Sequence, residues 1–152
     1  WPAVHMGDML RLGVLWKMGG LYSDSDTICM RSVEGITNMV ALGRPGHVNN
    51  HIMHFDKHHP FLDICMKSYA KSYKATCYLS GVKALHSMTQ QSCNIDVDKW
   101  EKNITASQPY PCPGFKVYPQ KAFNPIPYKE GAQLFKLGKK DDFDKMFKES
   151  YV

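Results

Sequence analysis

The stretch Gly19-Gly20-Leu21-Tyr22-Ser23-Asp24-Ser25-Asp26 follows an apolar, helix-like segment and carries most of the information in this chain. It combines a Gly-Gly break, a short apolar strand and two carboxylates, Asp24 and Asp26, two positions apart. In a turn at the end of a strand, one carboxylate can reach a metal while the other hydrogen-bonds a ligand. Mg²⁺ and Mn²⁺ are commonly held by one or two carboxylates together with substrate phosphates. The stretch therefore predicts a site for a divalent metal and a diphosphate.

The segment before this stretch predicts a helix over residues 7–18, preceded by Met6. A helix that is apolar nearly all round is expected to be buried. Two charges, Asp8 and Arg11, lie three residues apart and are therefore neighbours on one face of it. Charges on a buried helix must be paired or must serve a site. A structural ion pair is one interpretation, but the nearby Asp24 and Asp26 favour a shared cleft. The apolar residues of this segment include Met6, Met9, Leu10, Val14, Leu15, Trp16 and Met18.

Composition sets broad bounds on the protein class. The chain has 152 residues, 43% hydrophobic and 22% charged, as expected for one globular domain. The net charge of +5 is spread along the chain, so it gives no support for nucleic-acid binding; diphosphate binding or an anionic membrane nearby would explain it equally well. No run approaches the ~18 apolar residues of a membrane span, and no signal peptide is present. The chain starts at Trp1 without a Met, which suggests a fragment.

Hydrophobic periodicity and turn residues predict an α/β domain without internal repeats. The Pro-rich stretch 109–127 is expected to be irregular apart from one short strand. The expected helices are 7–18, 60–74, 81–92 and 141–149, and the expected strands are 21–24, 27–30, 38–43, 51–55 and 115–118.

The run Asp8-x-x-Arg11-x-x-x-Leu15-x-x-x-Gly19-Gly20-x-Tyr22-x-Asp24-x-Asp26 resembles the sugar-nucleotide-binding core of glycosyltransferase family 32. Residues 48–66 resemble the strand and helix that follow in the alpha-1,4-glycosyltransferase branch, and Ala122-Phe123-Asn124-Pro125-Ile126-Pro127-Tyr128 is similar to its Phe-x-Pro-Ile-Pro-aromatic signature. The resemblance implies the A-type glycosyltransferase fold, incomplete at both ends. Residues 1–152 would form one catalytic-domain fragment, with a DxD sugar-nucleotide-binding region at 1–45 and the alpha-1,4-glycosyltransferase region at 46–152.

The resemblance also implies roles for individual residues. Asn50 or His51 would hydrogen-bond a donor hydroxyl, and Gly81 falls where the family has a Gly-Pro turn near the acceptor. This chain lacks that Pro and has Tyr78 and Leu79 before Ser80, which puts the acceptor chemistry in doubt. The implied catalytic residues are Asp8, Arg11 and Asp24; the donor-binding residues are Asp24, Asp26, Asn50 and Gly81; and the ligands for Mn²⁺ or Mg²⁺ are Asp26 and Asp24.

The implied reaction is retaining transfer of galactose or an N-acetylhexosamine from a UDP-sugar to a galactose-terminated glycolipid or glycan, forming an alpha-1,4 linkage. Double displacement and front-face return both remain open. The alternatives are a non-catalytic sugar- or nucleotide-binding protein on the same fold, and a mannosyl- or glucosyltransferase of the wider family. The resemblance further implies a type II membrane protein of the Golgi lumen, anchored by a segment absent from this chain, with no nucleic-acid partner.

The cysteines form no closely spaced pair typical of a metal site. Cys29 and Cys65 lie in apolar segments and are expected to be buried thiols. Because the resembled family resides in the Golgi lumen, where disulfides persist, a Cys93 to Cys112 disulfide is expected, with Cys77 left over. The loop between that pair contains a glycosylation sequon at Asn103.

Five histidines between residues 47 and 59 suggest a rival hypothesis, a zinc or copper site. On a strand, His51 and His54 would face opposite sides of the sheet, which argues against a shared metal ion. A dedicated transition-metal site is therefore not expected.

Overall fold

The computed structural model describes residues 2–74, 80–95, 104–127, 129–132 and 140–152. They form a mixed α/β domain around a five-stranded sheet with the order β1-β3-β2-β5-β4. The α/β class predicted from the sequence is therefore confirmed. The strands are β1 (Gly20–Ser23), β2 (Met39–Arg44), β3 (His47–Phe55), β4 (Tyr110–Cys112) and β5 (Phe115–Tyr118).

The sheet is mixed in direction. Strand β3 pairs antiparallel with both β1 and β2, whereas β2 pairs parallel with β5, and β4 returns antiparallel to β5. The turn between β2 and β3 contains Gly46 with φ 66°, a left-handed conformation that suits glycine. Strands β2 and β3 therefore occupy the middle of the sheet, and β1 forms one edge.

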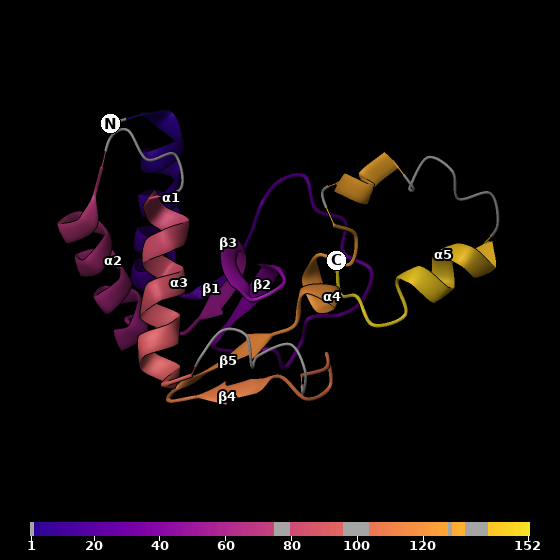
Figure 1. Cartoon of the computed structure of the whole chain (residues 1–152). Coiled ribbons are helices and arrows are strands. Elements are labelled where there is room, and N and C mark those ends of the chain that lie inside the picture. The colour runs from indigo at the N-terminus through magenta and orange to yellow at the C-terminus, as the bar shows by residue number, and fades with distance from the viewer. Residues whose placement is uncertain (1, 75–79, 96–103, 128, 133–139) are drawn as a thin grey trace.

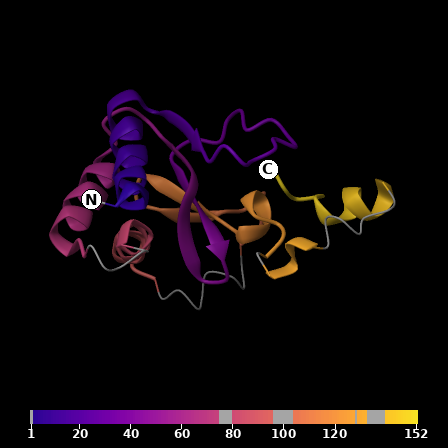
Figure 2. The ribbon, with the colours of Figure 1, turned by 90° about the horizontal axis from the view of Figure 1, so that it is seen from above.

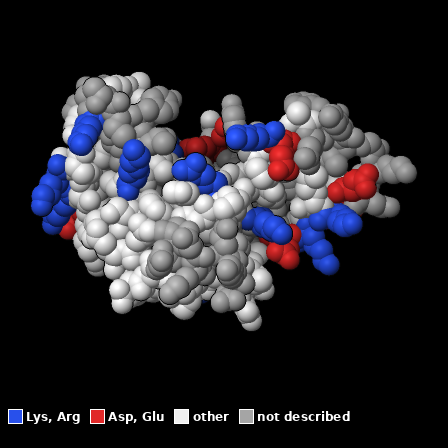
Figure 3. All heavy atoms as spheres, in the orientation of Figure 1, with Lys and Arg blue, Asp and Glu red and all other residues white. Residues whose placement is uncertain are grey.

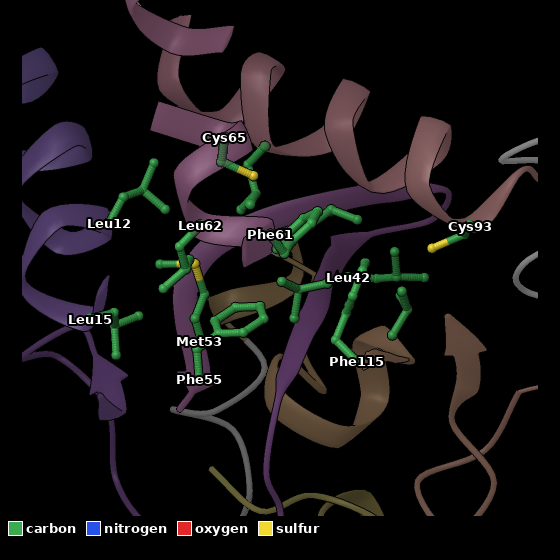
Figure 4. Close-up of a cluster of buried hydrophobic side chains, with 14 residues drawn as sticks. Leu12, Leu15, Leu42, Met53, Phe55, Phe61, Leu62, Cys65, Cys93 and Phe115 are labelled. Atoms are coloured by element: carbon green, nitrogen blue, oxygen red, sulfur yellow. The ribbon is translucent and has the colours of Figure 1, made fainter. Parts of the chain in front are cut away.

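Three helices cover one face of the sheet: α1 (Ala3–Met18), α2 (Pro60–Ser72) and α3 (Ser80–Cys93) (Figure 1). The main core lies between them and the sheet, where Leu12 of α1, Phe61 of α2 and Phe55 of β3 are buried (Figure 4). The rings of Phe61 and Phe115 stack with their centroids 4.2 Å apart. This core holds α1 against the sheet next to β1 and β3, and so positions the functional residues of α1.

A smaller core covers the opposite face of the sheet. Met39 and Ala41 of β2 point to it, as do Ile52 of β3 and Phe123 of the short helix α4 (Gln120–Phe123). Strand β2 is thus buried on both faces. Helix α5 (Lys140–Met146) lies at the far end of the molecule from α1, α2 and α3 (Figures 1 and 2). None of the helices that the structure describes has the length and hydropathy needed to cross a membrane.

The expected strand at 27–30 is wrong, because this segment is irregular. The last residue of the segment and the one after it form hydrogen bonds with the C-terminal end of the chain instead. The N–H groups of Met30 and Arg31 both donate to the carbonyl oxygen of Tyr151, at 2.8 and 3.3 Å. The Ile28 side chain is 75% exposed. A pairing so distant in sequence leaves no local signal.

The expectation that α1 is buried all round is also wrong. Leu12 and Leu15 are only 2% exposed, but Met6, Leu10 and Met18 are 57%, 66% and 69% exposed. The sheet and the two neighbouring helices contact one face of α1, so its opposite face keeps an apolar stripe at the surface.

The Pro-rich stretch 109–127 is more regular than expected. It contains β4 and α4 in addition to the expected strand at residues 115–118. Strand β4 is ordered by its antiparallel pairing with β5, which the local composition does not reveal. Helix α2 ends at Ser72 rather than residue 74, and α5 ends at Met146 rather than residue 149.

A disulfide joins Cys93, the last residue of α3, to Cys112 at the end of β4, with the two Cα atoms 4.8 Å apart. Cys65 is buried as expected, and burial raises the pKa of its thiol. Cys29, however, is exposed, which corrects the expectation of a buried thiol. Cys77 and the sequon residue Asn103 lie outside the described residues.

Candidate functional site

Two charged residues of α1 face the sheet at the start of the candidate site. Asp8 is 5% exposed, and Arg11 is largely buried. They lie one turn apart on the same face of the helix, with Arg11 Nε 4.0 Å from Asp8 Oδ1. A buried carboxylate needs hydrogen bonds as well as a charge partner, and these bonds come from β3.

Asn50 of β3 lies between the two charges and is itself only 5% exposed. Its side-chain Nδ2 donates to Asp8 Oδ1 at 2.7 Å, while its Oδ1 accepts from Arg11 Nη1 at 3.1 Å. The same Arg11 nitrogen also donates to the Asn50 carbonyl oxygen at 2.9 Å. Both ends of the Asn50 amide are therefore engaged by the protein, and the residue holds Asp8 and Arg11 in register.

The first carboxylate of the Asp-x-Asp turn joins the same network. Arg11 Nη1 lies 3.2 Å from Asp24 Oδ1, and the Tyr22 hydroxyl donates to that same oxygen at 2.8 Å. The Arg11 guanidinium carbon lies 4.9 Å from the centroid of the Tyr22 ring, a cation–π contact. Burial and the Asp24 hydrogen bond raise the pKa of Tyr22, so its hydroxyl keeps the proton that it donates.

The backbone fixes the position of this turn. Asp24 N–H donates to the His51 carbonyl oxygen at 2.9 Å, which extends the contact between β1 and β3 by one step beyond Ser23. The Thr27 hydroxyl donates to the Asp24 carbonyl oxygen, closing the turn on its other side. Asp24 is thus held at both its backbone and its side chain.

Asp26, in contrast, presents a free carboxylate. It is exposed in the turn, and no hydrogen bond or ion pair engages its side chain within the described part of the chain. Asp24 uses only Oδ1 for Arg11 and Tyr22, so Oδ2 has no partner there either. The turn therefore offers at least two hard oxygen donors to a ligand.

The donor set fits Mn²⁺ or Mg²⁺. No group of three or more His, Cys, Asp or Glu side chains gathers around one point among the described residues. A pair of carboxylates matches the protein's share in those sites where substrate phosphates and waters complete the coordination shell. Asp26 and Asp24 are the residues that would hold such an ion.

Gly81 lies in the first turn of α3, beside Asp8. A Cβ atom at this position would lie 2.5 Å from both Cβ and Oδ2 of Asp8. Only glycine allows α3 to approach Asp8 this closely. Gly81 was expected near the ligand; the structure places it directly against the buried carboxylate.

His51 links the turn to a distant segment. Its Nε2 lies 3.4 Å from the Phe123 carbonyl oxygen, while its Nδ1 is buried without a hydrogen-bond partner among the described residues. Burial lowers the pKa of this imidazole, so the ring is neutral at pH 7. Arg11 Nε is the other buried polar atom without such a partner.

A cleft of about 640 Å³ opens beside Asp26. Its walls come from residues 26–28 and Met30, from the Phe123–Pro127 signature and from the C-terminal region around Phe143 and Phe147. The signature was recognisable in the sequence, but the sequence indicated no role for Phe143 and Phe147. It also gave Tyr22 no role, although an aromatic two residues before Asp24 in a strand shares its face and is a usable signal.

Three more histidines of the stretch 47–59 have partners of their own. His54 Nδ1 accepts from the Asn38 N–H at 3.3 Å, and the ring of His58 packs on Trp16 with the centroids 4.5 Å apart. His59 Nδ1 accepts from the Phe61 N–H at the start of α2. His54 lies in β3, whereas His58 and His59 lie in the turn before α2.

Comparison with known proteins identifies the family. A family profile described as "Alpha 1,4-glycosyltransferase conserved region" matches residues 54–152. The chain belongs to this glycosyltransferase family. A second profile, "Glycosyltransferase sugar-binding region containing DXD motif", matches residues 1–42, which contain the charged residues of α1 and the Asp24–Asp26 turn.

Two kinds of glycosyltransferase are distantly similar to this chain. Lactosylceramide 4-alpha-galactosyltransferase is 24% identical in Gorilla gorilla gorilla and 23% in Homo sapiens, over 97% of this chain. Alpha-1,4-N-acetylglucosaminyltransferase of Homo sapiens is 26% identical over 95% of it. The chain spans 43%, 40% and 40% of the lengths of these relatives. No solved structure matches the chain.

Proposed function

We propose that this chain is the catalytic part of a retaining, metal-dependent alpha-1,4-glycosyltransferase. It transfers galactose or an N-acetylhexosamine from a UDP-sugar to a galactose-terminated glycolipid or glycan. The observation that carries the proposal is the pairing of a fixed network with a free carboxylate. Asp8, Arg11, Asn50 and Asp24 hold one another in place, while Asp26 remains available at the rim of a cleft.

The fixed network supplies the donor-sugar site. Arg11 Nη1 is committed to Asn50 and Asp24, so the rest of the guanidinium is free to donate to sugar hydroxyls or to the diphosphate. The planar guanidinium offers donors in a fixed geometry, which orients the anomeric carbon. Asp8 keeps the guanidinium charge balanced within a buried setting.

The Asp24–Asp26 turn supplies the leaving-group site. Breaking the anomeric C–O bond builds negative charge on the departing diphosphate. A Mn²⁺ or Mg²⁺ ion held by Asp26 and Asp24 would supply Lewis-acid stabilisation of that charge when bound. Tyr22 and Arg11 keep Asp24 directed into the site.

We also propose a fold family and a cellular location for the protein. The five-stranded sheet with its C-terminal arm, the chain from residue 120 to residue 152, would be part of an A-type glycosyltransferase domain whose DxD region is 1–45 and whose alpha-1,4 region is 46–152. The Cys93 to Cys112 disulfide supports an oxidising compartment, and we place the protein in the Golgi lumen as a type II membrane protein.

The test is the linkage of the product. The full-length protein is incubated with Mn²⁺, lactose and UDP-galactose, UDP-N-acetylglucosamine or UDP-N-acetylgalactosamine in turn. We expect one donor to give a trisaccharide whose anomeric proton coupling and inter-residue NMR contacts show an α linkage to O4 of galactose. A β linkage or another position would contradict the proposal. UDP binding without product from any donor would favour the non-catalytic binding protein.

A further inference from the structure

The cleft beside Asp26 is separate from the network around Arg11. Neither Arg11 nor its partners Asp8, Asn50 and Asp24 line it. The network and the cleft adjoin at the Asp24–Asp26 turn, whose first carboxylate pairs with Arg11 and whose second lines the cleft. A turn that lies between a charged network and a separate cleft can serve two substrates, one on each side.

The wall of the cleft suits a neutral ligand with an apolar face. Ile28 and Met30 line it with 75% and 37% of their surfaces exposed, and the half-buried rings of Phe143 and Phe147 lie together with centroids 4.4 Å apart. No Lys, Arg or His side chain is present among the described lining residues. Apart from an ion held at the Asp26 rim, the cleft brings no positive charge to a ligand, which suits the neutral ring of a sugar better than the anionic part of a nucleotide.

Asn124 and Asp26 add polar groups to this apolar lining. Asn124 donates its Nδ2 to the Gly43 carbonyl oxygen at 2.8 Å, which leaves its Oδ1 as an acceptor for a ligand. The free Asp26 carboxylate is a second acceptor. Hydroxyl donors on one edge and an apolar face on the other are the chemistry of a pyranose ring, whose C–H groups pack on aromatic rings.

The walls of the cleft are tied together by the end of the chain. Tyr151 N–H donates to the Ala122 carbonyl oxygen at 2.7 Å, and the Tyr151 carbonyl oxygen accepts from Met30. The ring of Tyr151 stacks on Phe123 with the centroids 5.3 Å apart. The cleft is therefore built by specific contacts between three segments distant in sequence.

We infer that this cleft is the acceptor subsite and that it takes the terminal β-galactoside of the acceptor. The ring packs its apolar face on the Ile28 and Phe143 side of the cleft, and its hydroxyls approach Asp26. The cleft of about 640 Å³ lies within the ~300–1,000 Å³ range of small-molecule sites. The inference rests on the proposed function for the identity of the sugar.

Lactose is the probe, used with the full-length protein. Ile28→Asn is the principal variant because its side chain is mostly exposed and its replacement leaves the core intact, and Phe143→Ala is the second. Ile64→Asn, which changes an apolar residue of α2 that is 48% exposed and lies outside the cleft, is the matched control. Lactose binding is measured by saturation-transfer NMR, the KM for lactose by UDP release, and the affinity for UDP with Mn²⁺ by calorimetry.

We expect Ile28→Asn and Phe143→Ala to raise the KM for lactose about tenfold and to weaken its NMR signal, while UDP affinity stays at the wild-type value. The control should match wild type throughout. An unchanged lactose KM and signal, or a parallel loss of UDP affinity, would overturn the acceptor assignment. Lactose binding that depends on Ile28 in a protein that releases no UDP from any donor would support the subsite and contradict the proposed transfer.

Discussion

At the scale of single residues, the site depends on side chains that hold one another in place. The family resemblance implies that Asn50 or His51 binds a donor hydroxyl, yet the Asn50 amide is engaged at both ends by Asp8 and Arg11. Its role is to position two charges in a buried place, where an unpaired carboxylate or guanidinium would be costly. Such a role is invisible until α1 and β3 are placed side by side.

The substitution Asn50→Asp tests this positioning role. The new carboxylate could still accept from Arg11, but the variant would lose the donor to Asp8 and add a second negative charge beside it. We expect the free energy of unfolding to fall by about 1–3 kcal/mol, measured by urea denaturation of the full-length protein. An unchanged unfolding midpoint would show that Asn50 does not hold Asp8.

Gly81 makes a second prediction at this scale. In Gly81→Ala the new methyl group would overlap Asp8, so we expect the carboxylate to shift and kcat/KM for the donor to fall at least about tenfold. Gly13→Ala is the matched control, because no atom lies within 4 Å of a Cβ at that position in α1. There, alanine should raise the unfolding free energy by up to about 1 kcal/mol. Equal activity of the two variants would contradict the close contact.

At the scale of elements, the sequence predicted the parts whose signals are local. Helix α2 shows helical spacing, and Pro60 at its first turn marks its start. The Gly19-Gly20 break correctly separates α1 from β1, because Gly19 has φ 69° and its Cβ position lies 2.7 Å from Lys57 N. The strand predicted at 27–30 was wrong, because the Met30 N–H donates to the distant Tyr151 carbonyl oxygen.

The same reasoning explains the two elements that the sequence missed. Strand β4 and helix α4 lie in a Pro-rich stretch with weak local propensity, and tertiary pairing orders them. The cleft was missed for the same reason, since its walls meet only when the C-terminus packs beside α4. The paired charges Asp8 and Arg11, in contrast, were predictable as neighbours from their spacing alone.

The disulfide gives a prediction about elements. It ties the end of α3 to β4 across 19 positions, so its removal should lower the unfolding free energy by about 3 kcal/mol. The double variant Cys93→Ser with Cys112→Ser is compared with Cys29→Ser, which changes an exposed free thiol. Thermal midpoints should fall for the double variant and stay near wild type for Cys29→Ser. The reverse order would contradict the assigned pairing.

At the scale of the whole molecule, charge is distributed and the functional chemistry is local. Lysine and arginine side chains are scattered over the face shown in Figure 3 and form no continuous basic surface there. The three helices and the main core make one end of the molecule, and the C-terminal arm with α5 makes the other (Figures 1 and 2). The Asp24–Asp26 turn lies at the junction, between the network on α1 and the cleft.

Global stability should depend on pH through two histidines. Burial lowers the pKa of His51, and burial with the nearby His47 and Arg44 lowers the pKa of His86. In the unfolded chain both titrate near about 6.5, so below that pH the unfolded state binds protons that the folded state does not. Their contribution to stability is therefore present above pH ~6.5 and is lost as the pH falls below it.

We expect urea midpoints to decrease between about pH 7.5 and pH 5, and a double variant, His51→Gln with His86→Gln, to decrease less steeply over the same range. An identical pH dependence in wild type and the double variant would show that these imidazoles do not carry the effect.

The most direct test of the central claim is UDP release by the full-length protein from a UDP-sugar, with and without Mn²⁺, in wild type, Asp26→Ala and Asp63→Ala. Asp63 is the control because it is an acid on α2 whose exposed ion pair with Lys67 contributes little. We expect Mn²⁺-dependent release by wild type and Asp63→Ala, and a loss of at least about a hundredfold in Asp26→Ala. Release that is independent of Mn²⁺, or unchanged in Asp26→Ala, would contradict a glycosyltransfer site built on this turn.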